Sequence, residues 1–259
     1  MSTATPNPFG IDGYSASTYG DAFADIYDEW YSDLHDNDFV EGICARLPDS
    51  PLRVLELGVG TGRLIRQWLA HRPHSSDHFI GVDSSDAMLA IARAQSFPPS
   101  VELELADFSQ SLPSGPFDII FVGYNTLFNL PNEEAIRSCF SHVASSLCPT
   151  GQFYIDAVIP RGEHAETVVE TRTMRNGDII ESHSTHDPVN QRITGKFVHD
   201  AETASSITRP WSVRYFTPTQ LDACAIEAGM TLVRRCADGN NTEFTSDSSR
   251  HITQYSLPL

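Results

Sequence analysis

The sequence has few basic residues for its length. Its 259 residues include 17 Lys and Arg against 34 Asp and Glu, and the formal charge is −17. Proteins that bind nucleic acid normally have a basic surface that displaces counterions from the phosphates. An anionic membrane surface repels an acidic chain for the same electrostatic reason. The composition therefore predicts no nucleic acid or membrane partner and favours a neutral or cationic small molecule.

Long apolar runs are also missing. No stretch approaches the roughly 18 apolar residues that a membrane-spanning helix needs. The polar segment 1–20 lacks the basic and then apolar regions of a secretory signal. We therefore expect a cytoplasmic protein, and the sequence leaves monomer and homodimer open.

Cysteine and histidine patterns typical of metal sites do not occur. The five cysteines form no C-x-x-C pair, and their odd number argues against a closed disulfide framework. No H-E-x-x-H motif occurs among the ten histidines. His183 and His186 lie in a predicted strand, where a spacing of three places them on opposite faces. We expect reduced thiols and no metal.

Strand and helix patterns alternate along most of the chain. Apolar or alternating runs predict seven strands, at residues 53–57, 78–82, 101–105, 118–123, 152–158, 230–236 and 251–255. Helical spacing follows the first, second and fourth strands and also covers 18–47. Strands that alternate with helices predict a parallel, doubly wound α/β sheet.

Between the fifth and sixth strands the pattern becomes one of short alternating runs. Turn signals such as Asn176-Gly177 separate these runs, and the last of them is expected at residues 212–216. They predict an antiparallel β cap inserted into the α/β unit. We expect four parts: a flexible tail (1–17), an N-terminal helix with a cofactor-binding α/β core (18–160), the inserted cap (161–215), and a C-terminal helix and strands that complete the core sheet (216–259).

A glycine-rich turn follows the first strand, in the segment VLELGVGTG. Gly58, Gly60 and Gly62 allow a ligand to approach the backbone closely, because no Cβ intervenes. Glu56 precedes them by two residues, and its carboxylate would repel a pyrophosphate but attract an ammonium group. The ligand is therefore expected to be cationic near the loop, as S-adenosylmethionine is with its α-ammonium and sulfonium. The alternative is a turn that only packs strand on helix.

Further candidates for cofactor binding follow the second and third strands. Asp83 stands at a strand end, where its two oxygens can accept hydrogen bonds from both ribose hydroxyls; it can also cap the next helix. We include Ser84 beside it. Met88 can cover an adenine or belong to the core. Asp107 and Phe108 can meet the adenine amino group and ring, although a solvated loop Asp is the alternative.

Five motifs now support a resemblance that covers about residues 50–158. The segments VLELGVGTGRL, GVDSSDAML, LADF, FDIIFV and LCPTGQFYID, in this order, resemble successive motifs of class I S-adenosylmethionine-dependent methyltransferases. More narrowly, DIYDEWY and the strand-rich stretch 166–215 resemble bacterial enzymes that N-methylate amino sugars, which in turn are similar to glycine N-methyltransferases. The resemblance implies a Rossmann-like fold, with S-adenosylmethionine as cofactor and S-adenosylhomocysteine as product.

The resemblance also implies roles for particular residues. It gives cofactor roles to Glu56, Gly58, Asp83, Asp107 and Phe108. The first helix is expected to close over the cofactor and the cap to cover the acceptor pocket. Tyr27 and Tyr31 are placed near the methyl group, with Tyr31 also against the cofactor. Both tyrosines can equally be ordinary aromatic core.

The sequence departs from the amino-sugar enzymes after its fourth strand, where it has YNTLFNL. The carboxyl ends of central strands are where α/β sheets bind ligands. We therefore expect Tyr124 at the cofactor and Asn125, Phe128 and Asn129 at the acceptor, although Phe128 can instead anchor the next helix. Trp211 and Arg214 of the cap are further acceptor candidates, with lesser support.

The sequence favours methyl transfer to the N or O atom of a small molecule, and specialised metabolism is one setting for such an enzyme. No general base is assigned. The available groups are His164, His183, His186, His199, His251 and Asp156. The alternatives are an NAD-dependent oxidoreductase, a non-catalytic cofactor-binding scaffold, and non-methylating use of S-adenosylmethionine.

Overall fold

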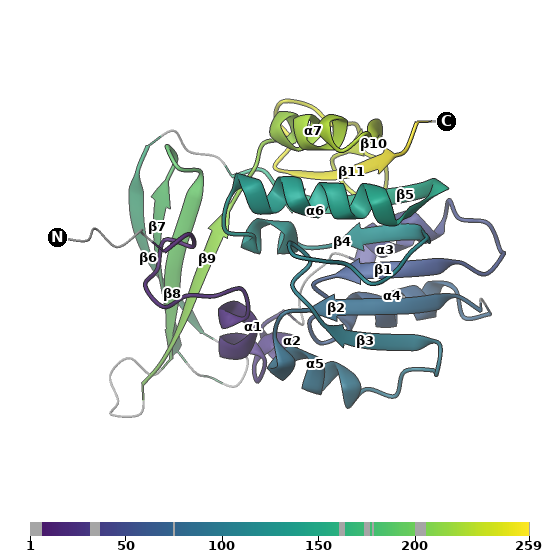
Figure 1. The fold of residues 1–259 in the computed structure, drawn as a ribbon. Helices are drawn as coiled ribbons and strands as arrows, with labels where there is room; N and C mark the ends of the chain where they lie inside the picture. The colour runs from purple at the N-terminus through teal and green to yellow at the C-terminus, as the bar shows by residue number, and fades with distance from the viewer. Residues whose placement is uncertain are drawn as a thin grey trace.

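A seven-stranded mixed sheet forms the core of the chain (Figure 1). The computed structural model describes residues 7–31, 37–74, 76–160, 164–173, 177, 179–199 and 206–258. The strand order is β10-β11-β5-β4-β1-β2-β3. The strands are β1 (Arg53–Leu57), β2 (His78–Asp83), β3 (Val101–Leu105), β4 (Phe117–Val122), β5 (Leu147–Val158), β10 (Thr231–Cys236) and β11 (Arg250–Ser256). The predicted doubly wound, seven-stranded sheet is confirmed.

The first five strands are parallel, and β11 pairs antiparallel with both β5 and β10. Helices cover both faces of the sheet, so the central strands are apolar on both sides. Side chains of α6 (Glu133–Ser146) and α7 (Pro218–Glu227) pack on one face. The other face packs against α3 (Asn37–Cys44), α4 (Arg63–His71) and α5 (Asp86–Arg93). Within the described ranges, no helix has the length and apolar character needed to cross a bilayer.

The cap is a separate antiparallel sheet in the order β6-β7-β8-β9 (Figure 1). Its strands are β6 (Glu166–Thr173), β7 (Ile179–Asp187), β8 (Arg192–His199) and β9 (Ile207–Arg214). The predicted inserted cap is confirmed, but its last strand begins five residues before the expected start at Ser212. β5 also begins earlier than expected, because the chain passes directly from α6 into the strand at Leu147.

The expected N-terminal helix over 18–47 is three short helices, α1 (Thr18–Phe23), α2 (Tyr27–Trp30) and α3. The apolar residues of this stretch pack against two different parts of the structure. Phe23 and Trp30 pack with Met88 of α5 and with the cap, whereas Phe39 and Ile43 pack under the core sheet. One straight helix cannot bury both sets, so the helix is broken. Residues 32–36 lie outside the described residues.

The expected flexible tail is wrong for residues 7–17. Phe9 and Tyr14 are each 7% exposed. The Ser212 hydroxyl of β9 donates to the Phe9 carbonyl at 2.5 Å, and the Ser212 amide donates to the Tyr14 hydroxyl at 3.2 Å. This segment is therefore fixed to the cap; residues 1–6 lie outside the described residues.

Candidate functional site

The glycine-rich turn after β1 takes left-handed backbone angles at Gly58 (φ 71°), Gly60 (φ 55°) and Gly62 (φ 81°). A Cβ on Gly58 would lie 2.1 Å from Thr126 Cγ2, and one on Gly62 would lie 2.6 Å from Phe97. A Cβ on Gly60 would meet no protein atom within 4 Å. Gly58 and Gly62 thus permit close packing, whereas Gly60 faces open space that a ligand can fill.

Asp83 ends β2 directly beside this turn. Its two carboxylate oxygens accept hydrogen bonds from the Gly60 amide at 2.8 Å and the Ser85 amide at 2.9 Å. Burial raises the pKa of Asp83, and these backbone hydrogen bonds oppose that effect. A carboxylate offers about four acceptor positions, so hydroxyl donors can still be added. Ser85 caps α5 by accepting from the Met88 amide at 3.2 Å, so the helix cap is not Asp83.

Gly60 and Asp83 border a first cavity of about 610 Å³. Nine of the sequence-predicted site residues line it: Tyr27, Gly58, Gly60, Asp83, Ser84, Met88, Asp107, Phe108 and Asn129. The remaining lining residues are Ala16, Tyr19, Gly20, Thr126 and Leu130. The structure thus brings together residues that are far apart in the sequence.

Glu56 and Gly62, both expected at the cofactor, do not line the first cavity. Glu56 is 2% exposed within β1. Side chains two residues apart share a strand face. Glu56 therefore shares its face with Val54, which packs with α3 and α4. Its role toward an ammonium group stays a prediction.

The N-terminal helices are bound to the loops that follow β1 and β2. The Thr61 hydroxyl donates to Asp28 of α2 at 2.5 Å, and the Ser85 hydroxyl donates to Asp21 of α1 at 2.6 Å. A Cβ on Gly20 of α1 would lie 2.4 Å from the Ser85 Cβ. The helix therefore packs closely against the start of α5 and covers the first cavity.

A second cavity, of about 670 Å³, lies between the core and the cap. Its lining residues are Tyr19, Tyr27, Tyr31, Tyr124, Asn125, Thr126, Asn129, Phe197, Trp211 and Val213. The two cavities share Tyr19, Tyr27, Thr126 and Asn129. Tyr31 and Tyr124, predicted at the cofactor, line this second cavity and not the first. The shared residues mark the boundary at which two bound molecules would meet.

Aromatic side chains gather at this boundary and beside it. The Tyr19 and Tyr31 hydroxyls share a hydrogen bond of 2.8 Å. The Tyr31 ring lies 4.6 Å from that of Tyr27 and 5.6 Å from that of Tyr124, measured between centroids. Burial raises the pKa values of Tyr19 and Tyr27 above their ordinary range, although Arg63 opposes the effect at Tyr27. These phenols therefore keep their protons at neutral pH.

Two predicted acceptor residues lie away from the second cavity. Phe128 is 1% exposed and packs on Phe216, so it belongs to the core. The Arg214 guanidinium lies 4.7 Å over the Phe216 ring and borders a different cavity, together with Arg192. Arg214 is near the end of β9, three residues beyond Trp211, and strand residues three apart point to opposite faces. Phe128 and Arg214 are therefore not among the residues that line the second cavity, and their acceptor roles stay predictions.

Tyr19, Thr126 and Phe197 line the second cavity although the sequence did not indicate them as site residues. Tyr19 had a usable signal, because it stands one helical turn before Phe23, and the two rings stack at 4.5 Å. Thr126 lies inside the YNTLFNL segment that was already suspected. Phe197 had no signal, because its alternating strand does not indicate which face of the cap meets the core.

The candidate general bases left open by the sequence do not line the second cavity. Burial lowers the pKa of His251 to about 4, and its Nδ1 lies 2.8 Å from the Thr253 hydroxyl. His186 contacts the Tyr215 hydroxyl at 2.9 Å, and His183 contacts Glu181 at 3.0 Å. Asp156 binds Arg250, as described below.

Comparisons with known proteins agree on one class. Residues 54–151 match a family model described as a methyltransferase domain. The CcbJ methyltransferase from Streptomyces caelestis is 27% identical, with a TM-score of 0.84, over 95% of this chain and 100% of that chain. A search of curated protein sequences found no match.

Two more distant solved structures share the fold. One is CalS10 with bound S-adenosylmethionine, an amino pentose methyltransferase from Micromonospora echinaspora (19% identity, TM-score 0.68, 90% of this chain and 97% of that chain). The other is the sugar N-methyltransferase KedS8 from a Streptoalloteichus species (17% identity, TM-score 0.66, 96% and 99%). The cap and the core sheet are both included in these matches.

Proposed function

We propose that this chain, a class I S-adenosylmethionine-dependent methyltransferase, methylates an amine nitrogen of a small molecule. The observation on which the proposal depends is the pair of adjoining cavities. The first is bordered by Gly60 and Asp83, and the second has aromatic and amide side chains. A cofactor in the first cavity and an acceptor in the second would lie next to each other across the shared wall.

The residues of the first cavity fit the cofactor. Open space next to Gly60 allows a ligand to approach the backbone, and Asp83 offers acceptors for ribose hydroxyls. Met88 and Phe108 present buried apolar surfaces for an adenine ring. When bound, S-adenosylmethionine supplies a methyl group whose transfer to an amine nitrogen leaves S-adenosylhomocysteine and one proton.

The protein's contribution is orientation, exclusion of water and a favourable field. Holding two reactants in line can account for about 7–11 kcal/mol of a barrier. Electron-rich rings attract a cation by about 0.5–2 kcal/mol each, and Tyr27 is one such ring on the shared wall. The helices α1 and α2 contribute Tyr19 and Tyr27 to this wall.

The chemistry of the second cavity favours an amine over a hydroxyl. A hydroxyl acceptor usually needs a general base, whereas a neutral amine attacks with its own lone pair. Among the described residues that line this cavity, there is no carboxylate and no imidazole. Tyr19 and Tyr27 do not supply a base there, since their raised pKa values keep them protonated.

A further cavity supports an acceptor that extends beyond its amine. It adjoins the second cavity, with which it shares Tyr31 and Phe197. Glu170, Thr171 and Ser182 give it polar groups that can bind hydroxyls. CalS10 and KedS8, which have the same fold, act on an amino pentose and a sugar nitrogen. We therefore infer an amino sugar, or a molecule that includes one, as the acceptor class.

The test is turnover with a panel of amino sugars, other amines and phenols. The expected result is S-adenosylhomocysteine release and a methylated product whose NMR spectrum places the new methyl on nitrogen. Methylation of phenols but not amines would contradict the nitrogen assignment. No turnover with any acceptor, despite cofactor binding, would favour the non-catalytic scaffold. The cytoplasmic location, the absence of nucleic acid partners, and the monomer or homodimer state stay predictions.

A further inference from the structure

The turn that follows β4 has an unusual backbone for its residues. Tyr124 (φ 46°) and Asn125 (φ 62°) are consecutive non-glycine residues in the left-handed region. Such angles persist only where the surrounding structure enforces them. Both residues line the second cavity. The groups that enforce this turn therefore shape the acceptor site.

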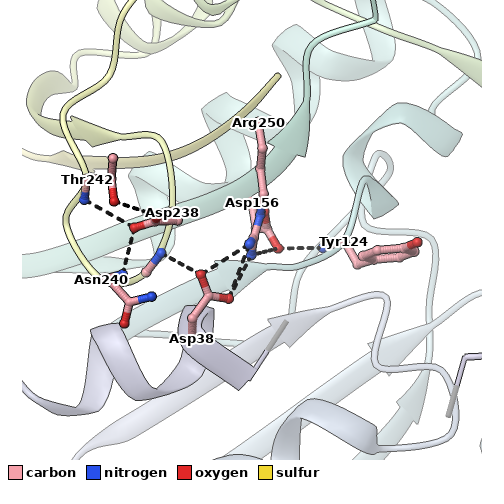
Figure 2. A network of polar contacts seen from close by, with 8 residues as sticks. Asp38, Tyr124, Asp156, Asp238, Asn240, Thr242 and Arg250 are labelled. Atoms are coloured by element: carbon pink, nitrogen blue, oxygen red, sulfur yellow. Dashed lines mark hydrogen bonds and ion pairs between the residues drawn. The ribbon is translucent and has the colours of Figure 1, made fainter. Parts of the chain in front are cut away.

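Asp156 of β5 provides much of that enforcement (Figure 2). Its carboxylate accepts from the Tyr124 amide at 3.4 Å, and its backbone carbonyl accepts from the Asn125 amide at 3.1 Å. The Asn125 side chain accepts in turn from the Val158 amide at 2.7 Å. The turn is thus fixed to the end of β5 at three points.

Arg250 of β11 holds the Asp156 carboxylate in place (Figure 2). Its Nε donates to one carboxylate oxygen at 2.6 Å and its Nη2 to the other at 3.0 Å. This two-point contact fixes the plane of the carboxylate. The Asp156 side chain is 3% exposed and that of Arg250 is 24% exposed. The carboxylate is therefore shielded from solvent and oriented by one cation.

The same guanidinium also binds Asp38 of α3. Its Nη1 lies 3.2 Å from both Asp38 oxygens, and the Gly239 amide donates to Asp38 at 2.7 Å. Burial alone would lower the pKa of Arg250, but the two carboxylates raise it overall, so the cation is stable. Arg250 thus connects α3, β5 and the loop before β11 at a single centre.

We propose that Arg250 is a positioning residue for the acceptor site, acting through Asp156 on Tyr124 and Asn125. The inference rests on the proposed function, since it assigns the second cavity to the acceptor. Arg250 and Asp156 line neither cavity. Their loss should therefore change acceptor use while leaving cofactor binding intact.

The test compares Asp156→Asn and Arg250→Lys with a matched control. The control is Asp222→Asn, which removes the partner of Arg235 in another C-terminal ion pair, with an N–O distance of 2.6 Å and side chains 12% and 26% exposed. That pair joins α7 to β10 and does not touch the Tyr124 turn. All three variants are expected to melt lower than the wild type, so stability alone does not separate them.

Two readouts separate positioning from general stability. In hydrogen exchange, the amides of residues 124–128 should exchange faster by about tenfold in both test variants and stay unchanged in the control. With an acceptor identified, kcat/KM for the acceptor should fall about tenfold, while the Kd for S-adenosylhomocysteine changes less than about twofold. The kcat/KM for the acceptor should fall less in Arg250→Lys than in Asp156→Asn, because lysine keeps the positive charge.

The proposal is overturned if exchange at 124–128 matches the wild type in both variants, or if the control accelerates it equally. Exchange needs no acceptor, so this result is independent of the proposed function. If exchange rises as expected but no amine is ever methylated, the proposed function fails and the acceptor part of the inference fails with it. If a variant does not fold, the other one decides.

Discussion

Replacing Gly60 with alanine tests whether this glycine is needed for ligand binding and not for the packing of the fold. The new Cβ would meet no protein atom within 4 Å, so the direct cost to the fold is the left-handed angle alone. That cost is about 1–2 kcal/mol for a residue with a Cβ. For a domain of this size, 1 kcal/mol lowers the melting temperature by about 2–4 °C. We therefore expect Gly60→Ala to melt only a few degrees below the wild type.

Cofactor binding should suffer more than stability does. The Cβ would occupy space in the first cavity, where the backbone meets the ligand. Each 1.4 kcal/mol of lost contact weakens binding about tenfold. We expect the Kd for S-adenosylhomocysteine, measured by calorimetry, to rise at least about tenfold in Gly60→Ala.

Gly58→Ala is the matched comparison. It has a similar φ, but its Cβ would lie 2.1 Å from Thr126 Cγ2. Overpacking typically adds about 1–3 kcal/mol to the strain, so this variant should lose more melting temperature than Gly60→Ala. The reasoning is refuted if Gly60→Ala binds S-adenosylhomocysteine as tightly as the wild type. It is also refuted if Gly58→Ala melts higher than Gly60→Ala.

Three other substitutions test separate parts of the site. Asp83→Asn exchanges one acceptor oxygen for a donor beside the Gly60 and Ser85 amides. Hydrogen bonds to charged groups are worth about 1.5–3 kcal/mol, so calorimetry should show cofactor affinity about 10–100-fold weaker. Affinity near that of the wild type would contradict this prediction. Tyr31→Phe removes the hydrogen bond to Tyr19, and steady-state kinetics should show acceptor kcat/KM reduced about 2–10-fold with little change in cofactor Kd. His251, with a pKa of about 4, stays neutral in the fold, whereas in the unfolded chain it binds a proton below about 6.5. Stability should therefore fall by roughly 3 kcal/mol as the pH drops from about 6.5 to 4, and denaturant titrations of His251→Asn should lack this component.

Features that depend on local sequence could be predicted well. β1 and β3 begin and end at the predicted residues, because continuous or alternating apolar runs bounded by turns determine short strands. The strand ends next to the glycine turn and Asp83 could be located for the same reason. Parallel strands bring their carboxyl ends to one edge, which is why the predicted residues that follow β1, β2 and β3 share the first cavity: Gly58, Gly60, Asp83, Ser84, Asp107 and Phe108.

Features that depend on distant contacts could not be predicted. Residues 7–17 look like a polar tail, but Ser212, about 200 positions later, binds them through Phe9 and Tyr14. Asp156 ends the LCPTGQFYID motif, but Arg250 lies 94 residues later and belongs to no recognisable motif, so the sequence does not indicate that the two side chains pair. The register of the cap strands decides that Trp211 faces the second cavity and Arg214 does not, and alternation alone leaves that choice open.

The most direct test of the central claim is a calorimetric titration of the purified protein with S-adenosylhomocysteine and, in parallel, with NADH. The account predicts that S-adenosylhomocysteine binds at a single site, that Asp83→Asn weakens it, and that NADH produces no binding heat. Binding of NADH without binding of S-adenosylhomocysteine would contradict the account.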